Sequence, residues 1–228
     1  FESDRALQLS KIEELELAIN ELQQVYGPIP ISSDTKIAFV DLAIIDEIET
    51  GNYDLLVLGH DHADSWLTSY SSNTILAIID ECNIPTIVVP NGWRRPPLNI
   101  GLVNNYFKTK PTTLNSTITA IANKKRSNLT FMGKAVEEQL GLDNLHEDVL
   151  VEHIKLKQLG YSEVETQLLL NRFDLMSIYF EGFSSWERIR HHSLLHNFVI
   201  KAPIPFLIVP VTWSKPTILS YESIHVQK

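Results

Sequence analysis

The sequence predicts an α/β protein built from two doubly wound parallel sheets in tandem. Short apolar runs rich in Val, Ile and Leu alternate with helical patterns, which is typical of parallel strands joined by right-handed crossovers. The sequence also repeats itself, because Asp54 matches Asp174 and Trp93 matches Trp213, 120 positions later in each case. Prolines recur at the same spacing, so we interpret the chain as one βαβ unit that is present twice.

The two copies are predicted to differ at their beginnings. Strands of the first copy are expected at residues 35–40, 54–58 and 86–90, and its helices at 4–26, 42–50 and 66–82. Strands of the second copy are expected at 98–104, 128–132, 154–159, 174–180 and 206–210, and its helices at 112–124, 136–153, 162–171 and 186–201. The second copy therefore starts with a strand, a helix and a strand that the first copy lacks. The repeat predicts two domains, residues 1–95 and 96–228.

Composition restricts the classes of function. The 228 residues include 19 Lys and Arg against 28 Asp and Glu, a formal net charge of −9 at pH 7. The chain therefore lacks the excess of basic residues that is typical of proteins that bind nucleic acid or anionic membranes. No apolar run approaches the roughly 20 residues that span a bilayer. The single cysteine, Cys82, fits a reducing compartment. We therefore expect a cytoplasmic protein that binds neither nucleic acid nor membrane.

The first copy carries a loop pattern after its strand at 54–58. Gly59 ends the strand, His62 follows after two intervening residues, and Ser72-Asn73 follows after nine more. The next strand of this copy ends in a Val-Val-Pro sequence at 88–90.

The second copy has different residues at the same positions. Tyr179 stands at the position of Gly59, Gly182 at that of His62, and His192-Ser193 at that of Ser72-Asn73. Its last strand ends in Ile-Val-Pro at 208–210.

With these positions, each copy resembles a domain of the universal stress protein family, and the chain resembles a tandem member with an incomplete first domain. The resemblance implies a Rossmann-like sheet of the kind found in adenine nucleotide alpha hydrolases. In that family, a glycine ends the fourth strand, a second glycine follows, and Gly-Ser or Gly-Thr opens the fourth helix. Glycines let the backbone approach a phosphate, and the amides of a helix N-terminus hold its charge. Each copy of this chain retains one of the glycines.

The resemblance predicts degenerate nucleotide loops. A side chain at position 179 takes the space that the phosphates need, and Asn104 or Asn105 stands where the family has an aspartate near the adenosine. We therefore expect the second copy not to bind ATP. An alternative is that the first copy binds an adenine nucleotide through the loop from Gly59, with Ser72, Asn73 and Thr74 donating hydrogen bonds at a helix N-terminus.

A second alternative is a metal-dependent hydrolase. The loop after Gly59 contains His60, His62 and Asp64, a spacing that can supply metal ligands from one turn at the carboxyl end of a strand. The dinuclear metallohydrolases with a similar run have a further histidine after the aspartate, where this chain has Ser65. A solvated loop is therefore the favoured interpretation, and no bound metal is expected.

The leading hypothesis is a non-catalytic stress-response or regulatory protein without a cofactor. No residues assemble a nucleophile, a base and an oxyanion hole, so an unknown protein partner is expected instead of a substrate. In the family, the fifth strands pair antiparallel between domains or subunits. We therefore expect a pseudo-dimer of the two copies through strands 86–90 and 206–210, and a homodimer is a further possibility.

Overall fold

The computed structural model describes residues 2–60, 66–103, 114–133, 142, 144–156, 173–180 and 203–210. The chain divides into two compact units, residues Phe1–Ala43 and Ile44–Lys228. The boundary that the repeat predicts, at residues 95–96, lies inside the second unit.

The first unit contains the long helix α1 (Glu2–Tyr26) and an irregular segment that follows it. Gly27 ends the helix with a positive φ of 82°, a conformation that glycine adopts without steric cost, and its N–H donates to the Gln23 carbonyl. The strand expected at 35–40 is wrong. Residues Ile37 and Phe39 are each 72% exposed, and a short apolar segment forms a strand only where it has a neighbour to pair with.

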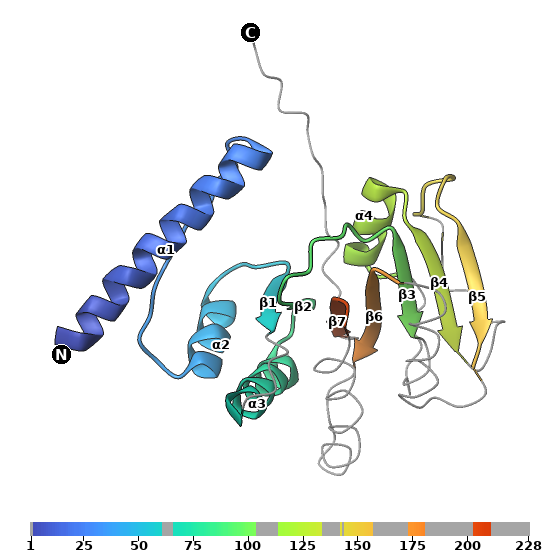
Figure 1. The fold of residues 1–228 in the computed structure, drawn as a ribbon. Coiled ribbons are helices and arrows are strands. Elements are labelled where there is room, and N and C mark those ends of the chain that lie inside the picture. Colours follow the sequence, from blue (N-terminus) through green and yellow to red (C-terminus); the bar gives the residue numbers. More distant parts are fainter. Residues whose placement is uncertain are drawn as a thin grey trace, which may run out of the picture. The chain divides into compact units, whose positions relative to one another are not determined.

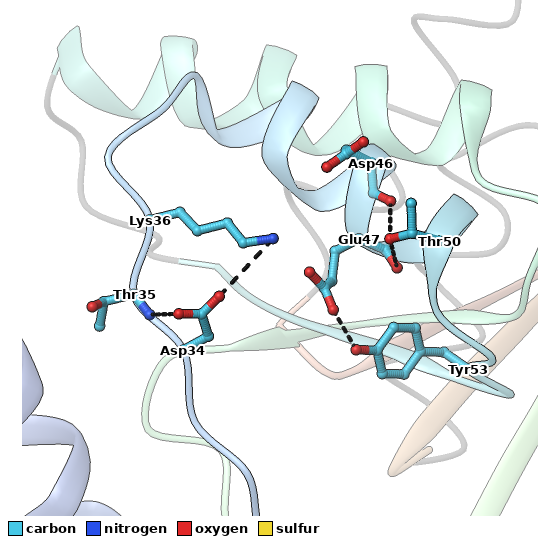
Figure 2. A network of polar contacts seen from close by, with 7 residues as sticks. All are labelled: Asp34, Thr35, Lys36, Asp46, Glu47, Thr50 and Tyr53. Carbon is cyan, nitrogen blue, oxygen red and sulfur yellow. Dashed lines mark hydrogen bonds and ion pairs between the residues drawn. The ribbon is translucent and has the colours of Figure 1, made fainter.

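Helix α2 (Val40–Thr50) was expected from residue 42 and is confirmed. The end of the helix is fixed by side chains, as Figure 2 shows. The Thr50 hydroxyl donates to the Asp46 carbonyl over 2.7 Å, and the Tyr53 hydroxyl donates to Glu47 Oε1 over 2.6 Å. These bonds hold the turn that leads from α2 into the first strand.

The second unit is built on one seven-stranded sheet, in the order β1-β2-β7-β6-β3-β4-β5 (Figure 1). Its strands are β1 (Leu56–His60), β2 (Thr86–Pro90), β3 (Asn99–Val103), β4 (Asn128–Gly133), β5 (Val151–Lys155), β6 (Leu175–Phe180) and β7 (Phe206–Pro210). Helices α3 (Trp66–Glu81) and α4 (Ser116–Lys125) belong to the same unit. The α/β fold with a largely parallel sheet is therefore confirmed.

The sheet is parallel within each copy and antiparallel where the copies meet. β1 pairs parallel with β2, and β7, β6, β3, β4 and β5 are parallel to one another. β2 and β7 pair antiparallel, with Thr86 opposite Ile208 and Val88 opposite Phe206. The two parallel sheets predicted from the repeat are thus joined into one, through the strands at 86–90 and 206–210.

Two hydrophobic clusters cover the two faces of this sheet. One packs α3 against both copies, since it includes Leu76 of α3, Val88 of β2 and Phe206 of β7. The other packs α4 against the second copy and includes Ile118 of that helix and Leu207 of β7. The first cluster crosses the antiparallel joint, so the two copies share a core.

One region of the second copy differs from its prediction. The helix expected at 136–153 is wrong over its described part, because residues 144–149 form turns and Val151–Lys155 is strand β5. The strand expected at 154–159 therefore lies three residues earlier. Leu145 and Val149 have the spacing of a helix face, but both pack against the sheet from a turn.

Candidate functional site

Ligands in open parallel sheets bind outside the carboxyl ends of the strands, at the point where the strand order reverses. In the second copy this switch point lies between β3 and β6, because the chain proceeds from β3 to β4 and β5 on one side and returns to β6 on the other. Tyr179 is the fifth residue of β6 and lies near its carboxyl end. The switch point is therefore the place to look for a second-copy site.

Tyr179 packs at this switch point. Its side chain is 5% exposed and belongs to the cluster that includes Leu114 and Ile118 next to α4. The backbone N–H of Asn115 donates to the Tyr179 hydroxyl over 2.8 Å. Burial of the phenol raises the pKa of Tyr179 to about 12, because the ionised form loses its hydration, and the hydrogen bond from Asn115 partly opposes this.

The start of α4 is satisfied by residues of the chain itself. Asn115 is the N-cap, and its Oδ1 accepts from the Thr117 N–H over 2.8 Å. Together with the bond to Tyr179, two of the N–H groups at this helix start have partners within the protein. A helix N-terminus binds an anion through such N–H groups, so this one has fewer to offer.

The nucleotide loop predicted for the first copy begins at the carboxyl end of β1. Gly59 and His60 are the last two residues of the strand, and a Cβ built on Gly59 would meet no atom within 4 Å. His60 is buried, and its carbonyl accepts from the Asn91 N–H over 2.7 Å. Within the described part of the chain, the surroundings of Gly59 are therefore open, whereas His60 is enclosed.

The turn after β2 lies beside this strand end. Gly92 has a positive φ of 76°, which suits glycine, and the Trp93 N–H donates to the Pro90 carbonyl over 3.2 Å. The Trp93 ring packs against the core, and its Nε1–H donates to the Arg95 carbonyl over 3.0 Å. The turn is therefore held by packing and backbone bonds.

The structure places Ser72, Asn73 and Thr74 differently from the prediction. Helix α3 begins at Trp66, so these residues lie well inside the helix and not at its N-terminus. Backbone N–H groups inside a helix are bonded to the preceding turn and are not available to a phosphate. The helical pattern at 66–82 thus predicted the start of α3 correctly, whereas the family motif, which put a helix N-terminus at Ser72, was wrong.

Several of the predicted site residues lie outside the described part of the chain. These are His62 and Asp64 of the first copy, and Asn104, Gly182, His192 and Ser193 of the second. Among the described residues, no group of three or more His, Cys, Asp or Glu side chains could hold a metal ion. Within the same residues, no helix is both long and apolar enough to cross a membrane.

Sequence reasoning missed Asn115, the residue that links Tyr179 to α4. The helix was expected to begin at residue 112, but it begins at Ser116 and its N-cap is Asn115. Asparagine is as good an N-cap as threonine, so the sequence contained the signal for this position. Its bond to Tyr179 joins residues that are 64 positions apart, and no local pattern indicates such a contact.

Comparison with known proteins bears on the fold. No protein-family model matches the sequence, and no curated protein matches it. Among solved structures, the chain is similar to the crystal structure of a universal stress protein from Archaeoglobus fulgidus DSM 4304, with a TM-score of 0.55 and 14% sequence identity. The match covers 88% of this chain and 76% of that chain. This chain therefore has an α/β fold like that of a universal stress protein.

Proposed function

We propose that this protein is a non-catalytic stress-response or regulatory protein of the universal stress protein type, with degenerate nucleotide loops. The similarity of its fold to a universal stress protein supports the general class. The packing of Tyr179 at the switch point supports the loss of nucleotide binding in the second copy. The proposal includes a cytoplasmic location and action through a protein partner.

Tyr179 is the observation on which the proposal mainly depends. The phenol is buried where a phosphate would need the backbone of β6 to be accessible, and its hydroxyl already accepts the Asn115 N–H. A ligand at this point would have to displace the ring from its apolar cluster and break that bond. Removing a buried aromatic side chain from its contacts costs about 3–5 kcal/mol, so a nucleotide would bind the second copy weakly.

The antiparallel pairing of β2 and β7 supports a pseudo-dimer within one chain. The apolar strands that the two copies contribute are equivalent by the repeat, and each covers the edge of the other. Bare apolar edges promote aggregation, so their pairing stabilises the folded chain. In this proposal the joint fixes one copy against the other and leaves the outer surfaces for a partner.

An ATP-binding first copy is the competing function. The open space around Gly59 favours it, since a ligand can approach the backbone there. The position of Ser72 and Asn73 inside α3 is unfavourable for it. The two functions make opposite predictions for ligand binding.

A thermal-shift titration with ATP, AMP and zinc separates the functions. For the proposed non-catalytic protein, we expect the melting temperature Tm to move by less than about 1 °C with each ligand. A ligand at 100 times its Kd adds about 2.7 kcal/mol to the unfolding free energy, which corresponds to a rise of about 5 °C or more for a chain of this size.

Native mass spectrometry of the purified chain should precede the titration, because a ligand carried through purification would hide the shift. A rise of several degrees with ATP would contradict the proposal and favour the loop from Gly59. A rise with zinc that a chelator reverses would instead favour the metal site at His60, His62 and Asp64.

A further inference from the structure

The two outer strands of the seven-stranded sheet differ in chemistry. β5 ends the sheet on one side, and Glu152, His153 and Lys155 are exposed along it. β1 ends the sheet on the other side and has no Lys, Arg, Asp or Glu in Leu56–His60. Charged residues on an edge strand prevent pairing with further chains. Of the two outer strands that the structure describes, β5 has this protection and β1 does not.

Alternate residues of β1 direct their backbone groups toward β2, and the residues between them direct theirs away from it. The Leu56 N–H donates to the Pro85 carbonyl over 2.9 Å, and the His60 carbonyl accepts from the Asn91 N–H over 2.7 Å. Successive residues of a strand direct their N–H and C=O groups to opposite sides, so those of Val57 and Gly59 face outward. We name this side of the strand the β1 edge. In the described part of the chain, no strand pairs with it.

The second copy shows what occupies the equivalent edge. By the repeat, Leu55, Val57 and Leu58 correspond to Leu175, Ser177 and Ile178 of β6. That side of β6 pairs with β3 in parallel, with Ile100 opposite Leu175, Leu102 opposite Ser177 and Val103 opposite Ile178. The repeat therefore gives both the direction and the register of a strand that would fit the β1 edge.

A helix also covers β6 on one face. Leu175 and Tyr179 pack in the cluster that contains Ile118 and Ala122 of α4. No described element covers the corresponding face of β1, since Val57 is 58% exposed and a Cβ on Gly59 would meet no described atom within 4 Å. A strand followed by a helix, arranged like β3 and α4, would satisfy the edge and cover this face.

We propose that the β1 edge is a docking site for a polypeptide segment that adds a parallel strand and then a helix. The strand is uncharged and apolar, about five residues long as in β3, and the helix is amphipathic as in α4. Backbone hydrogen bonds to Val57 and Gly59 supply affinity, and burial of Leu55 and Val57 supplies the apolar contact. This surface is distinct from the switch point, so the inference does not depend on nucleotide binding.

A binding experiment uses a peptide of residues 96–126, which contains the β3 and α4 sequences of this chain. The labelled peptide is titrated with the full chain, and binding is followed by fluorescence anisotropy. We expect saturable binding of one peptide per chain. Hydrogen exchange at the amides of Val57 and Gly59 should slow about tenfold or more in the complex. A scrambled peptide of the same composition should not bind.

Variants of the chain locate the contact. Val57→Lys places a charge on the uncovered face, and Val57→Pro removes an outward N–H, so each should weaken binding about tenfold or more. Leu150→Lys is the matched control, because Leu150 is an exposed apolar residue beside the protected edge, 63% exposed. It should leave peptide affinity unchanged. The melting temperature of each variant checks that the chain still folds.

Three results would overturn the inference. The first is the absence of saturable binding by the native peptide. The second is slow exchange of Val57 and Gly59 in the free monomeric chain, which would mean that the edge is already covered. The third is a dimer of the chain that Val57→Lys dissociates, which would make a second copy the occupant.

Discussion

Gly59 and Tyr179 occupy the same position of the repeat, 120 residues apart, and have opposite surroundings. No described atom crowds Gly59 at the end of β1, whereas Tyr179 is buried at the end of β6 and accepts a hydrogen bond from the residue that caps α4. The difference follows from the neighbours of each strand. β6 lies between β3 and β7, whereas β1 has a described neighbour on one side only.

Val57 and Ser177, two residues before Gly59 and Tyr179, are also equivalent positions of the repeat with opposite surroundings. The valine is 58% exposed and the serine is fully buried, the reverse of their usual preferences. A strand's own residues therefore do not determine how deeply it is buried. The elements that pack against it do, and the two copies differ in those elements.

Substituting glycine for Tyr179 should change the unfolding free energy more than any other substitution that tests this comparison. Tyr179→Gly makes the second copy resemble the first, but it leaves a cavity in the cluster next to α4. We expect the unfolding free energy to fall by about 3–5 kcal/mol, as for other buried aromatic residues that are truncated. Urea unfolding measures the change. Tyr179→Phe is the control, and it should cost about 1 kcal/mol through the lost hydrogen bond. A loss below 1 kcal/mol for the glycine variant would mean that the ring is not well packed.

The buried phenol should also make stability depend on pH at the alkaline end. Burial raises the pKa of Tyr179 in the folded chain to about 12 from its usual 10.0, so the unfolded chain releases this proton first as the pH rises. Burial of the neutral phenol contributes fully to the unfolding free energy below pH 10. This contribution is lost as the pH rises toward 12, and the unfolding free energy falls by about 2–3 kcal/mol in total. Urea unfolding of the native chain and of Tyr179→Phe between about pH 9 and pH 12 isolates this contribution. Parallel curves for the two proteins would contradict the burial of the hydroxyl.

The smallest effect is expected at the open position. Gly59→Ala adds a methyl group where no atom lies within 4 Å, and the backbone of this residue is not in the left-handed region. We expect the unfolding free energy to rise by about 0.4–1 kcal/mol, because alanine restricts the unfolded chain. Gly101→Ala is the matched control in a buried strand, where the new Cβ would contact Met176 Sδ and lie 3.0 Å from Met132 Cε. Overpacking there should cost about 1–3 kcal/mol. Equal changes in the unfolding free energy for the two variants would mean that Gly59 is packed as tightly as Gly101, which would contradict the contrast between the two copies.

The sequence predicted the central strands well and the edges of the copies poorly. Residues 86–90 and 206–210 are continuous apolar runs between prolines, and both form strands with those bounds. Residues 35–40 have similar composition but form no strand, because composition does not reveal whether a partner strand is present. The helix expected at 136–153 failed for a related reason, since the same apolar spacing can be satisfied by turns that pack on a sheet.

The candidate site was predicted in part. The steric argument for Tyr179 needed only the repeat and the resemblance to a family with glycine at that position. Its bond to Asn115 depends on the distance between two elements far apart in the sequence. The misplacement of Ser72 and Asn73 had a different cause. The family pattern was followed for the start of α3, although the helical pattern from residue 66 indicated an earlier one.

The antiparallel joint between β2 and β7 determines how the two candidate sites are oriented. Because β1 and β2 run opposite to β7 and β6, the carboxyl end of β1 and the carboxyl end of β6 lie on opposite ends of the sheet. One small molecule cannot touch Gly59 and Tyr179 together. Binding of more than one ligand molecule per chain would therefore mean that the two sites are separate. Any energetic coupling between these sites would have to pass through the hydrophobic core that both copies share.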